Sequence, residues 1–108
     1  MSEHQDATPI ILADGKHLRF VRRSGWEYVE RKGVTGIVGI VAVTDDRKLL
    51  LVEQYRTPVN QRVIEIPAGL VGDEAAMEEE SQIAAARREL LEETGYYAES
   101  LSPLASGP

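Results

Sequence analysis

Short apolar runs separated by turn-forming residues dominate the first two thirds of the chain. The runs 10–12 and 18–21 flank residues 14–15, Asp-Gly, a dipeptide that tolerates the positive φ of a tight hairpin turn. In residues 26–31, large apolar and charged residues alternate, as they do in a strand with one face in water. This pattern predicts a β-hairpin followed by an amphipathic strand.

The middle of the chain predicts the centre of a β-sheet. Residues 36–44 are rich in Ile and Val, a polar turn follows, and residues 49–55 form another apolar run. We therefore expect these two runs to form a central hairpin. A further strand, residues 62–66, leads to residues 67–69, Pro-Ala-Gly, where proline ends the ladder and glycine lets the chain turn sharply.

One helix is predicted, over residues 81–94. This stretch contains no Gly or Pro and is rich in Ala and Leu, which favours a helix. Ser81 is placed to cap its start, and Gly95 is placed just past its end. Leu90 provides a face that can pack on the sheet. The acidic residues 72–80 fit either a loop or an extra helical turn, and we favour the loop.

Composition narrows the classes of function. The chain has 108 residues and a formal net charge of −6, which argues against a nucleic acid partner. It has no apolar run of the roughly 18 residues that a membrane helix needs and no signal-peptide pattern at the N-terminus, so we expect a cytoplasmic protein that does not contact the membrane. Because there is no cysteine, a metal would be held by carboxylate and carbonyl oxygens, which suit a hard cation such as Mg²⁺.

Three glutamates share one face of the predicted helix. The helical period of roughly 3.6 residues places Glu89, Glu92 and Glu93 together. Like charges at this spacing mildly destabilise a bare helix, and a divalent cation would offset their repulsion. Taken alone, a solvated acidic face is the commoner meaning of such a pattern, so the surrounding residues decide.

The surrounding residues resemble the signature of the Nudix hydrolases, Gly-x5-Glu-x7-Arg-Glu-U-x-Glu-Glu-x-Gly-U, in which U is a bulky aliphatic residue. The second half matches from Glu80 through the run from Arg88 to Gly95, with Tyr96 in the last position. The first half departs from the signature, because ten residues rather than five separate Gly69 from Glu80. Loops tolerate such insertions, so we expect a longer surface segment and an unchanged helix face. The family pattern also pairs Arg88 with Glu80 in a structural ion pair.

The resemblance implies an α/β fold of the Nudix type, an α/β/α sandwich with a mixed sheet, in a single domain over residues 1–108. Its parts would be N-terminal strands in 10–35, a central sheet in 36–67, and the Nudix loop and helix in 68–96. The C-terminal part, with the last strands and a second helix, would be missing. The few apolar residues after Tyr96 cannot cover a second face of the sheet, so we expect the natural protein to continue or a partner chain to supply that layer.

The resemblance also implies the metal ligands. Glu89, Glu93 and the backbone carbonyl of Ala68 would hold Mg²⁺, or Mn²⁺ in its place, and Glu92 would assist as a further ligand or through a water. Glu92 and Glu93 would thereby take part in catalysis. Such a cation offsets the repulsion between a diphosphate and a nucleophile, orients the phosphate oxygens and acidifies a water.

Within the family, the chain is most similar to the branch that cleaves ADP-ribose and nucleotide sugars. In that branch Trp26, Glu27 and Arg31 would help bind the nucleotide, often across a dimer interface of N-terminal strands, so we expect a homodimer. An indole can stack on adenine, and a carboxylate can accept from its amino group. Without the resemblance, Trp26 fits a core aromatic residue equally well. The residues that mark this branch are Trp26-Glu27, Gln54-Tyr55-Arg56 and Glu65-Ile66-Pro67-Ala68-Gly69-Leu70.

Two further residues are implied to contact the substrate. Arg56 matches a phosphate-binding arginine, whose planar fork suits a pair of diphosphate oxygens. Its alternative is an exposed charge at the end of a strand. Leu70 would contact the ligand through its backbone.

The predicted function is the Mg²⁺-dependent hydrolysis of the diphosphate in ADP-ribose or a related nucleotide sugar, which yields AMP and a sugar phosphate. Two alternatives stay open: a Nudix pyrophosphatase that acts on another dinucleotide such as GDP-mannose, and a non-catalytic module that binds nucleotides. No general base is assigned, because in this family it is usually a glutamate on a loop well after the helix. We therefore expect residues 1–108 alone to be weakly active or inactive.

Overall fold

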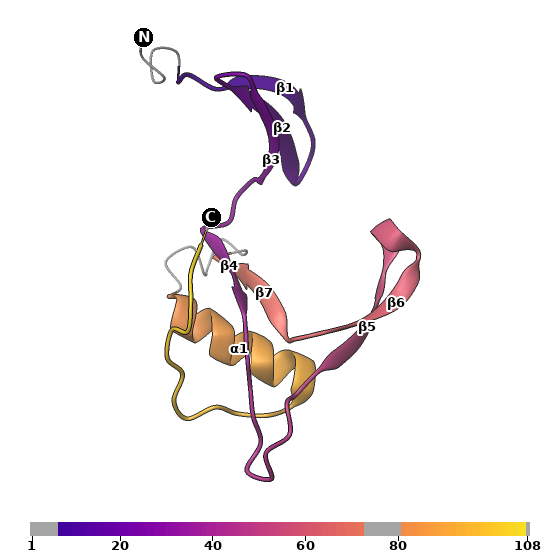
Figure 1. The fold of residues 1–108 in the computed structure, drawn as a ribbon, viewed down its shortest axis with the longest axis vertical. Helices are drawn as coiled ribbons and strands as arrows, with labels where there is room; N and C mark the ends of the chain where they lie inside the picture. Colours follow the sequence, from indigo (N-terminus) through magenta and orange to yellow (C-terminus); the bar gives the residue numbers. More distant parts are fainter. Residues whose placement is uncertain (1–6, 73–80, 108) are drawn as a thin grey trace. The chain divides into compact units, whose positions relative to one another are not determined.

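The chain divides into two compact units, Met1–Val34 and Thr35–Pro108. Of these, the computed structural model describes residues 7–72 and 81–107. Both units contain antiparallel strands, and the second also contains an α-helix (Figure 1). Within the described ranges, no helix has the length and apolar character needed to cross a membrane.

The first unit is a three-stranded antiparallel sheet in the order β1-β2-β3. It confirms the predicted hairpin and the strand that follows it. Lys32, just past the last strand, binds the hairpin turn, since its ammonium group lies 2.7 Å from Asp14 Oδ1 and 2.9 Å from the carbonyl oxygen of Gly15. The strands are β1 (Ile10–Asp14), β2 (Leu18–Arg23) and β3 (Trp26–Arg31).

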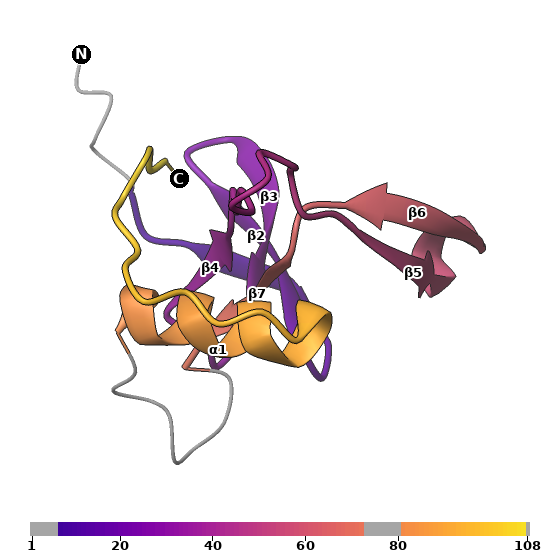
Figure 2. The same ribbon diagram turned by 90° about the horizontal axis from the view of Figure 1, so that it is seen from below.

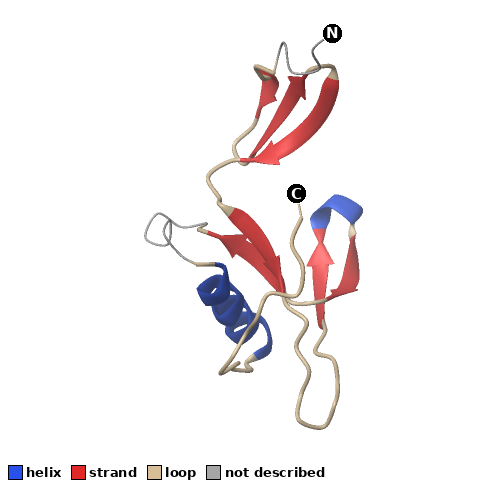
Figure 3. Ribbon diagram, turned by 60° about the vertical axis from the view of Figure 1, so that its left-hand side comes forward, coloured by secondary structure: helices blue, strands red, loops and turns tan. Residues whose placement is uncertain are grey.

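The second unit contains two separate antiparallel strand pairs, β4-β7 and β5-β6 (Figure 3). The short 3-10 helix η1 connects β5 to β6 at the tip of their hairpin. All the strand pairs in the described residues are antiparallel. The elements are β4 (Gly36–Gly39), β5 (Val52–Arg56), η1 (Thr57–Val59), β6 (Gln61–Glu65) and β7 (Ala68–Val71).

The predicted central hairpin of residues 36–44 and 49–55 is confirmed only near its turn. An isolated bridge joins Val43 to Leu49, and adjacent backbone hydrogen bonds support it. The outer parts of both runs pair elsewhere, β4 with β7 and β5 with β6. The sequence pattern identified the strands but not their partners, because any apolar run offers the same backbone donors and acceptors.

The predicted sharp turn at Pro67 to Gly69 is wrong in part. Pro67 does interrupt the strand, because it has no N–H to donate, and its carbonyl accepts from the Ile40 N–H at 2.8 Å. Strand β7 begins at Ala68, so Gly69 lies inside a strand and not in a turn. Gly69 pairs with Val38 in the β4-β7 ladder. Glycine is therefore needed at this position for a reason other than a turn.

The predicted helix is confirmed as α1 (Gln82–Thr94). Ser81 caps its start by accepting from the Ala84 N–H at 3.1 Å. Gly95 ends it in the left-handed conformation at φ 79°, and the Gly95 N–H donates to Leu91 O. The expected acidic loop and Glu80 fall within 73–80, which lie outside the described residues.

Helix α1 packs on one face of the β4-β7 pair, below the strands in Figure 2. Ile40, Val71, Ala85 and Leu90 are buried here, with 0 to 3% of their surface exposed. Other apolar side chains of this unit are exposed, including Ile37 at 66%. The helix thus forms one layer on a partial α/β fold.

Gly69 is the point of closest approach between β7 and α1. A Cβ atom added at Gly69 would overlap the carboxylate carbon and the Cγ of Glu89. The Glu89 side chain would therefore have to shift away from the strand to accommodate such an atom. Glycine at this position therefore allows the Glu89 carboxylate to lie directly on the strand.

We expect the substitution Gly69→Ala to lower the free energy of unfolding by about 1–3 kcal/mol, the usual cost of overpacking a well-packed contact. Urea denaturation of the whole chain measures this loss. Gly36→Ala is the matched control, because Gly36 lies on the paired strand and a Cβ there meets nothing within 4 Å. Equal stability of the two variants would show that Glu89 moves aside without cost.

The contact between Lys32 and Asp14 predicts a pH dependence in the first unit. The hydrogen bond from Lys32 lowers the pKa of Asp14 below its ordinary value. A lowered pKa means that the stabilisation is present above the pKa of the unfolded chain and is lost as pH falls through the folded value. In Lys32→Met, NMR titration should find the Asp14 pKa higher than in the wild type, whereas the control Lys16→Met should leave it unchanged. An Asp14 pKa that is the same in Lys32→Met and in the wild type would contradict the prediction.

Candidate functional site

The outer edge of β7, meaning the backbone groups of Ala68 and Leu70 that point away from β4, organises the candidate site. The Ile40–Pro67 hydrogen bond puts Ala68 and its partner Gly39 in a non-hydrogen-bonded position of the ladder. At such a position both the N–H and the C=O point away from the paired strand. The Ala68 N–H donates to Glu93 Oε1 at 3.3 Å, and the Leu70 carbonyl accepts from Arg88 Nη2 at 3.2 Å. Side chains of α1 therefore contact this edge directly.

Glu89 is largely enclosed. Its side chain is 14% exposed and lies on Gly69. Burial raises the pKa of Glu89 above its ordinary value, the hydrogen bond and the charge of Arg88 oppose this shift, and the charges of Glu92 and Glu93 add to it. A cation bound beside Glu89 would offset the unfavourable energy of enclosing its charge and of its repulsion from Glu92 and Glu93.

Arg88 connects the helix glutamates to the β7 edge. Its Nη1 atom lies 2.9 Å from Glu89 Oε1 and 3.7 Å from Glu92 Oε1, while Nη2 bonds to the Leu70 carbonyl. The Glu80 partner expected for Arg88 lies outside the described residues. Within the described residues, Arg88 is held instead by its contacts with the Glu89 carboxylate and the Leu70 carbonyl.

The oxygen donors at this site have the chemistry that a hard cation requires. Glu89, Glu93 and the outward carbonyl of Ala68 supply carboxylate and carbonyl oxygens, and Gly69 leaves a cradle in which the Glu89 carboxylate lies. Glu92 is 59% exposed on the flank of the helix. Within residues 7–72 and 81–107, however, no three His, Cys, Asp or Glu side chains converge closely enough to hold a metal. Glu93 bonds to Ala68 and Glu89 to Arg88, so side-chain rotation must accompany metal binding.

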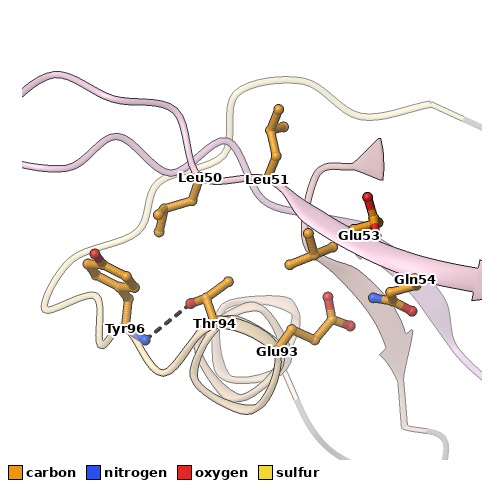
Figure 4. Close-up of a pocket in the computed structure, with 8 residues that line it drawn as sticks. Leu50, Leu51, Glu53, Gln54, Glu93, Thr94 and Tyr96 are labelled. Atoms are coloured by element: carbon orange, nitrogen blue, oxygen red, sulfur yellow. Dashed lines mark hydrogen bonds between the residues drawn. The ribbon is translucent and has the colours of Figure 1, made fainter. Parts of the chain in front are cut away.

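A pocket of ≈ 630 Å³ adjoins Glu93, between the segment that contains β5 and the end of α1 (Figure 4). Its size lies within the usual range for small-molecule sites. Tyr96 and Leu50 lie at one end, and the side chains of Gln54 and Glu93 point into the other. The lining residues are Leu50, Leu51, Val52, Glu53, Gln54, Glu93, Thr94 and Tyr96.

The structure places the two predicted ligand contacts of the second unit as follows. Arg56, at the end of β5, is paired with Glu65, whose Oε2 lies 2.9 Å from Nε and 2.7 Å from Nη2. Binding a phosphate there would mean sharing or displacing this carboxylate. The Leu70 backbone carbonyl is already bonded to Arg88.

The predicted nucleotide-binding residues of the first unit do not share one surface. Side chains along a strand alternate between its faces, so Trp26 projects from one face of the sheet while Glu27 and Arg31 project from the other. Trp26 is 79% exposed, which excludes the core position considered as its alternative. Glu27 forms an exposed ion pair with Arg22 at 3.1 Å.

The sequence analysis did not assign Gln54 or Tyr96 to the site, although both line the pocket. For Gln54 a signal was present, because it lies two positions before Arg56 on a predicted strand and therefore on the same face. For Tyr96 no local pattern indicated the contact, since it follows the helix in an irregular segment.

Comparison with known families agrees with this division of the molecule. The family model described as the NUDIX domain matches residues 33–108. This range coincides closely with the second compact unit, Thr35–Pro108, which contains α1 and the β7 edge.

Similar proteins carry different names. The chain is 42% identical over 71 residues to an ADP-ribose pyrophosphatase of Bacillus subtilis, covering 66% of this chain and 36% of that protein. A methanol dehydrogenase activator of Bacillus methanolicus is 41% identical over 71 residues, with the same two shares. An ADP-sugar pyrophosphatase of Mus musculus is 32% identical over 114 residues, covering 90% of this chain and 50% of that protein.

The chain thus spans half or less of the length of these relatives. Its family match nevertheless covers more than two thirds of the chain and includes the helix whose glutamates and arginine contact the β7 edge. The chain belongs to the Nudix hydrolase family.

Proposed function

We propose that the protein hydrolyses the diphosphate of ADP-ribose or a related nucleotide sugar in a Mg²⁺-dependent reaction, giving AMP and a sugar phosphate. The observation that carries the proposal is the meeting of Glu89, Glu93 and the β7 edge at one place in the second unit. A helix that only displayed an acidic face to solvent would not direct two of its glutamates onto a strand.

Each residue of the site then has a role that follows from its position. Glu89, Glu93 and the Ala68 carbonyl hold Mg²⁺, or Mn²⁺ in its place, and the exposed Glu92 assists directly or through a water. Arg88 holds Glu89 and the strand in register through its contacts with the Glu89 carboxylate and Leu70. The cation, when bound, neutralises charge on the diphosphate and acidifies a water.

The choice of ADP-ribose is supported by relatives named for ADP-ribose and ADP-sugars. A relative with a different name is equally similar, so identity alone does not select the substrate. A pyrophosphatase for GDP-mannose keeps the same catalytic residues and changes the base and sugar contacts. A non-catalytic nucleotide-binding module gives no reason to direct Glu89 and Glu93 onto the strand.

The first unit is proposed to supply the nucleotide contacts Trp26, Glu27 and Arg31, in a homodimer formed through the N-terminal strands. Apolar side chains exposed on this sheet support that role, among them Ile10 at 55% and Val29 at 59%. The complete α/β/α sandwich with a mixed sheet is proposed for the whole protein because the chain belongs to the Nudix family, and the cytoplasmic location stays a proposal from the sequence.

The proposed activity is tested on protein expressed from the complete reading frame, with ADP-ribose and Mg²⁺. We expect release of AMP with a kcat of about 1 s⁻¹ or more, the ordinary range for enzymes, and no release after chelation of the metal. Glu93→Gln should lower kcat/KM about 100-fold, because a lost charge at the cation site removes about 3 kcal/mol of transition-state stabilisation.

The matched control for this assay is Glu99→Gln, which removes one exposed glutamate outside the site and should leave kcat/KM unchanged. A parallel assay with GDP-mannose compares the rate of GMP release with the rate of AMP release from ADP-ribose. Faster GMP release would replace the substrate assignment, and binding of both nucleotides without turnover would favour the non-catalytic module.

Glu89 provides a separate test of the cation site. Because a ligand that binds the folded state alone stabilises it, the melting temperature of the wild type should rise by several degrees in saturating Mg²⁺ or Mn²⁺. Glu89→Gln should abolish most of this rise, and Glu99→Gln should retain it, as followed by circular dichroism. An equal rise in Glu89→Gln would place the cation elsewhere.

A further inference from the structure

The pocket beside Glu93 has two chemically different ends. Leu50, Leu51 and Val52 contribute apolar groups, whereas Glu53, Gln54 and Glu93 contribute polar ones. Among the eight described lining residues, only Gln54 carries side-chain N–H donors. An anion that entered the polar end would therefore meet one amide donor and two carboxylates.

The two carboxylates at this end are already engaged. Glu53 Oε1 accepts from Arg62 Nε at 2.6 Å, and Glu93 Oε1 accepts from the Ala68 N–H. Gln54 is half-buried, and its amide and the Glu93 carboxylate point toward one another across the pocket (Figure 4). Gln54 therefore lies where the pocket meets Glu93, one of the proposed ligands of the cation.

A neutral amide suits this position better than a charged donor. A lysine or arginine here would form an ion pair with Glu93 and compete with a cation for it. The amide of glutamine donates a hydrogen bond without cancelling the charge of the carboxylate. It can thus serve an anion and leave Glu93 free to bind a metal.

The register of the β5-β6 hairpin gives Gln54 a second partner in anion binding. Gln54 pairs with Val63, and Arg56 pairs with Gln61, so Gln54 and Arg56 lie on the same face of β5, roughly 7 Å apart along the strand. Both side chains are long enough to reach beyond this spacing. Two donors in a row on one strand face match a ligand with two linked phosphoryl groups.

We propose that Gln54 is a substrate-binding residue, whose side-chain amide donates a hydrogen bond to a non-bridging oxygen of the diphosphate next to the cation at Glu93. This inference rests on the proposed function, because it takes a diphosphate as the ligand. Gln54 orients the phosphoryl group adjacent to Glu93, and Arg56 binds the other one by sharing or displacing the Glu65 carboxylate.

The test compares Gln54→Leu and the size-matched Gln54→Glu with the wild type, all in protein from the complete reading frame. Calorimetry with an ADP-ribose analogue that has a methylene bridge in place of the diphosphate oxygen should show affinity about 10- to 100-fold weaker in Gln54→Leu, the usual effect of losing a hydrogen bond to a charged group. Gln54→Glu should bind still more weakly, because it adds a like charge. The affinity for Mn²⁺ alone, followed by electron paramagnetic resonance, should be unchanged in Gln54→Leu.

Gln82→Leu is the control, because it removes an exposed amide at the first turn of α1 and should bind the analogue like the wild type. Wild-type affinity in both Gln54 variants would overturn the inference while leaving the proposed function intact. Weaker Mn²⁺ binding in Gln54→Leu would also overturn it, since Gln54 would then act through the cation site. If the wild type neither bound nor cleaved the diphosphate, the proposed function itself would fail and the role of Gln54 with it.

Discussion

The close contact between α1 and β7 is the constraint on which the rest of the second unit depends. Glycine at position 69 lets the Glu89 side chain lie on the strand, where an added methyl group would overlap it. Apolar packing of Val71, Ala85 and Leu90 holds the helix at this distance. A carboxylate with only 14% of its side chain exposed thereby lies against a backbone, an electrostatically unfavourable position of the kind found at functional sites.

The same contact is stabilised by polar groups that use the free edge of the strand. The Ala68 N–H donates to Glu93 and the Leu70 carbonyl accepts from Arg88, so the helix satisfies two of the backbone groups that β4 leaves unpaired. A strand edge with unpaired groups needs such partners when it is covered. Of these two side chains, Glu93 is also proposed to bind the cation, and Arg88 contacts its other proposed ligand, Glu89.

The proposed cation site and the expected nucleotide contacts lie on different units of this molecule. The family match and the proposed cation site belong to the second unit. The expected nucleotide contacts belong to the first, where strand alternation separates Trp26 from Glu27 and Arg31. A single copy of this sheet cannot present all three on one surface, which is consistent with contacts drawn from more than one face or more than one chain. The Gln54 pocket instead offers a phosphate contact within the second unit itself.

By itself, the sequence determined the features that depend on residues close together in the chain. The helix with its caps at Ser81 and Gly95, the hairpin at Asp14 and the spacing of the helix glutamates were all predicted, because capping and periodicity act over a few positions. Only the tertiary structure decided that β4 pairs with β7, that Gly69 serves packing rather than a turn, and that Gln54 faces Glu93. These features depend on contacts between segments distant in sequence, such as the bond between Ala68 and Glu93, 25 positions apart. Local propensity carries no information about which distant backbone group a strand or a carboxylate will meet.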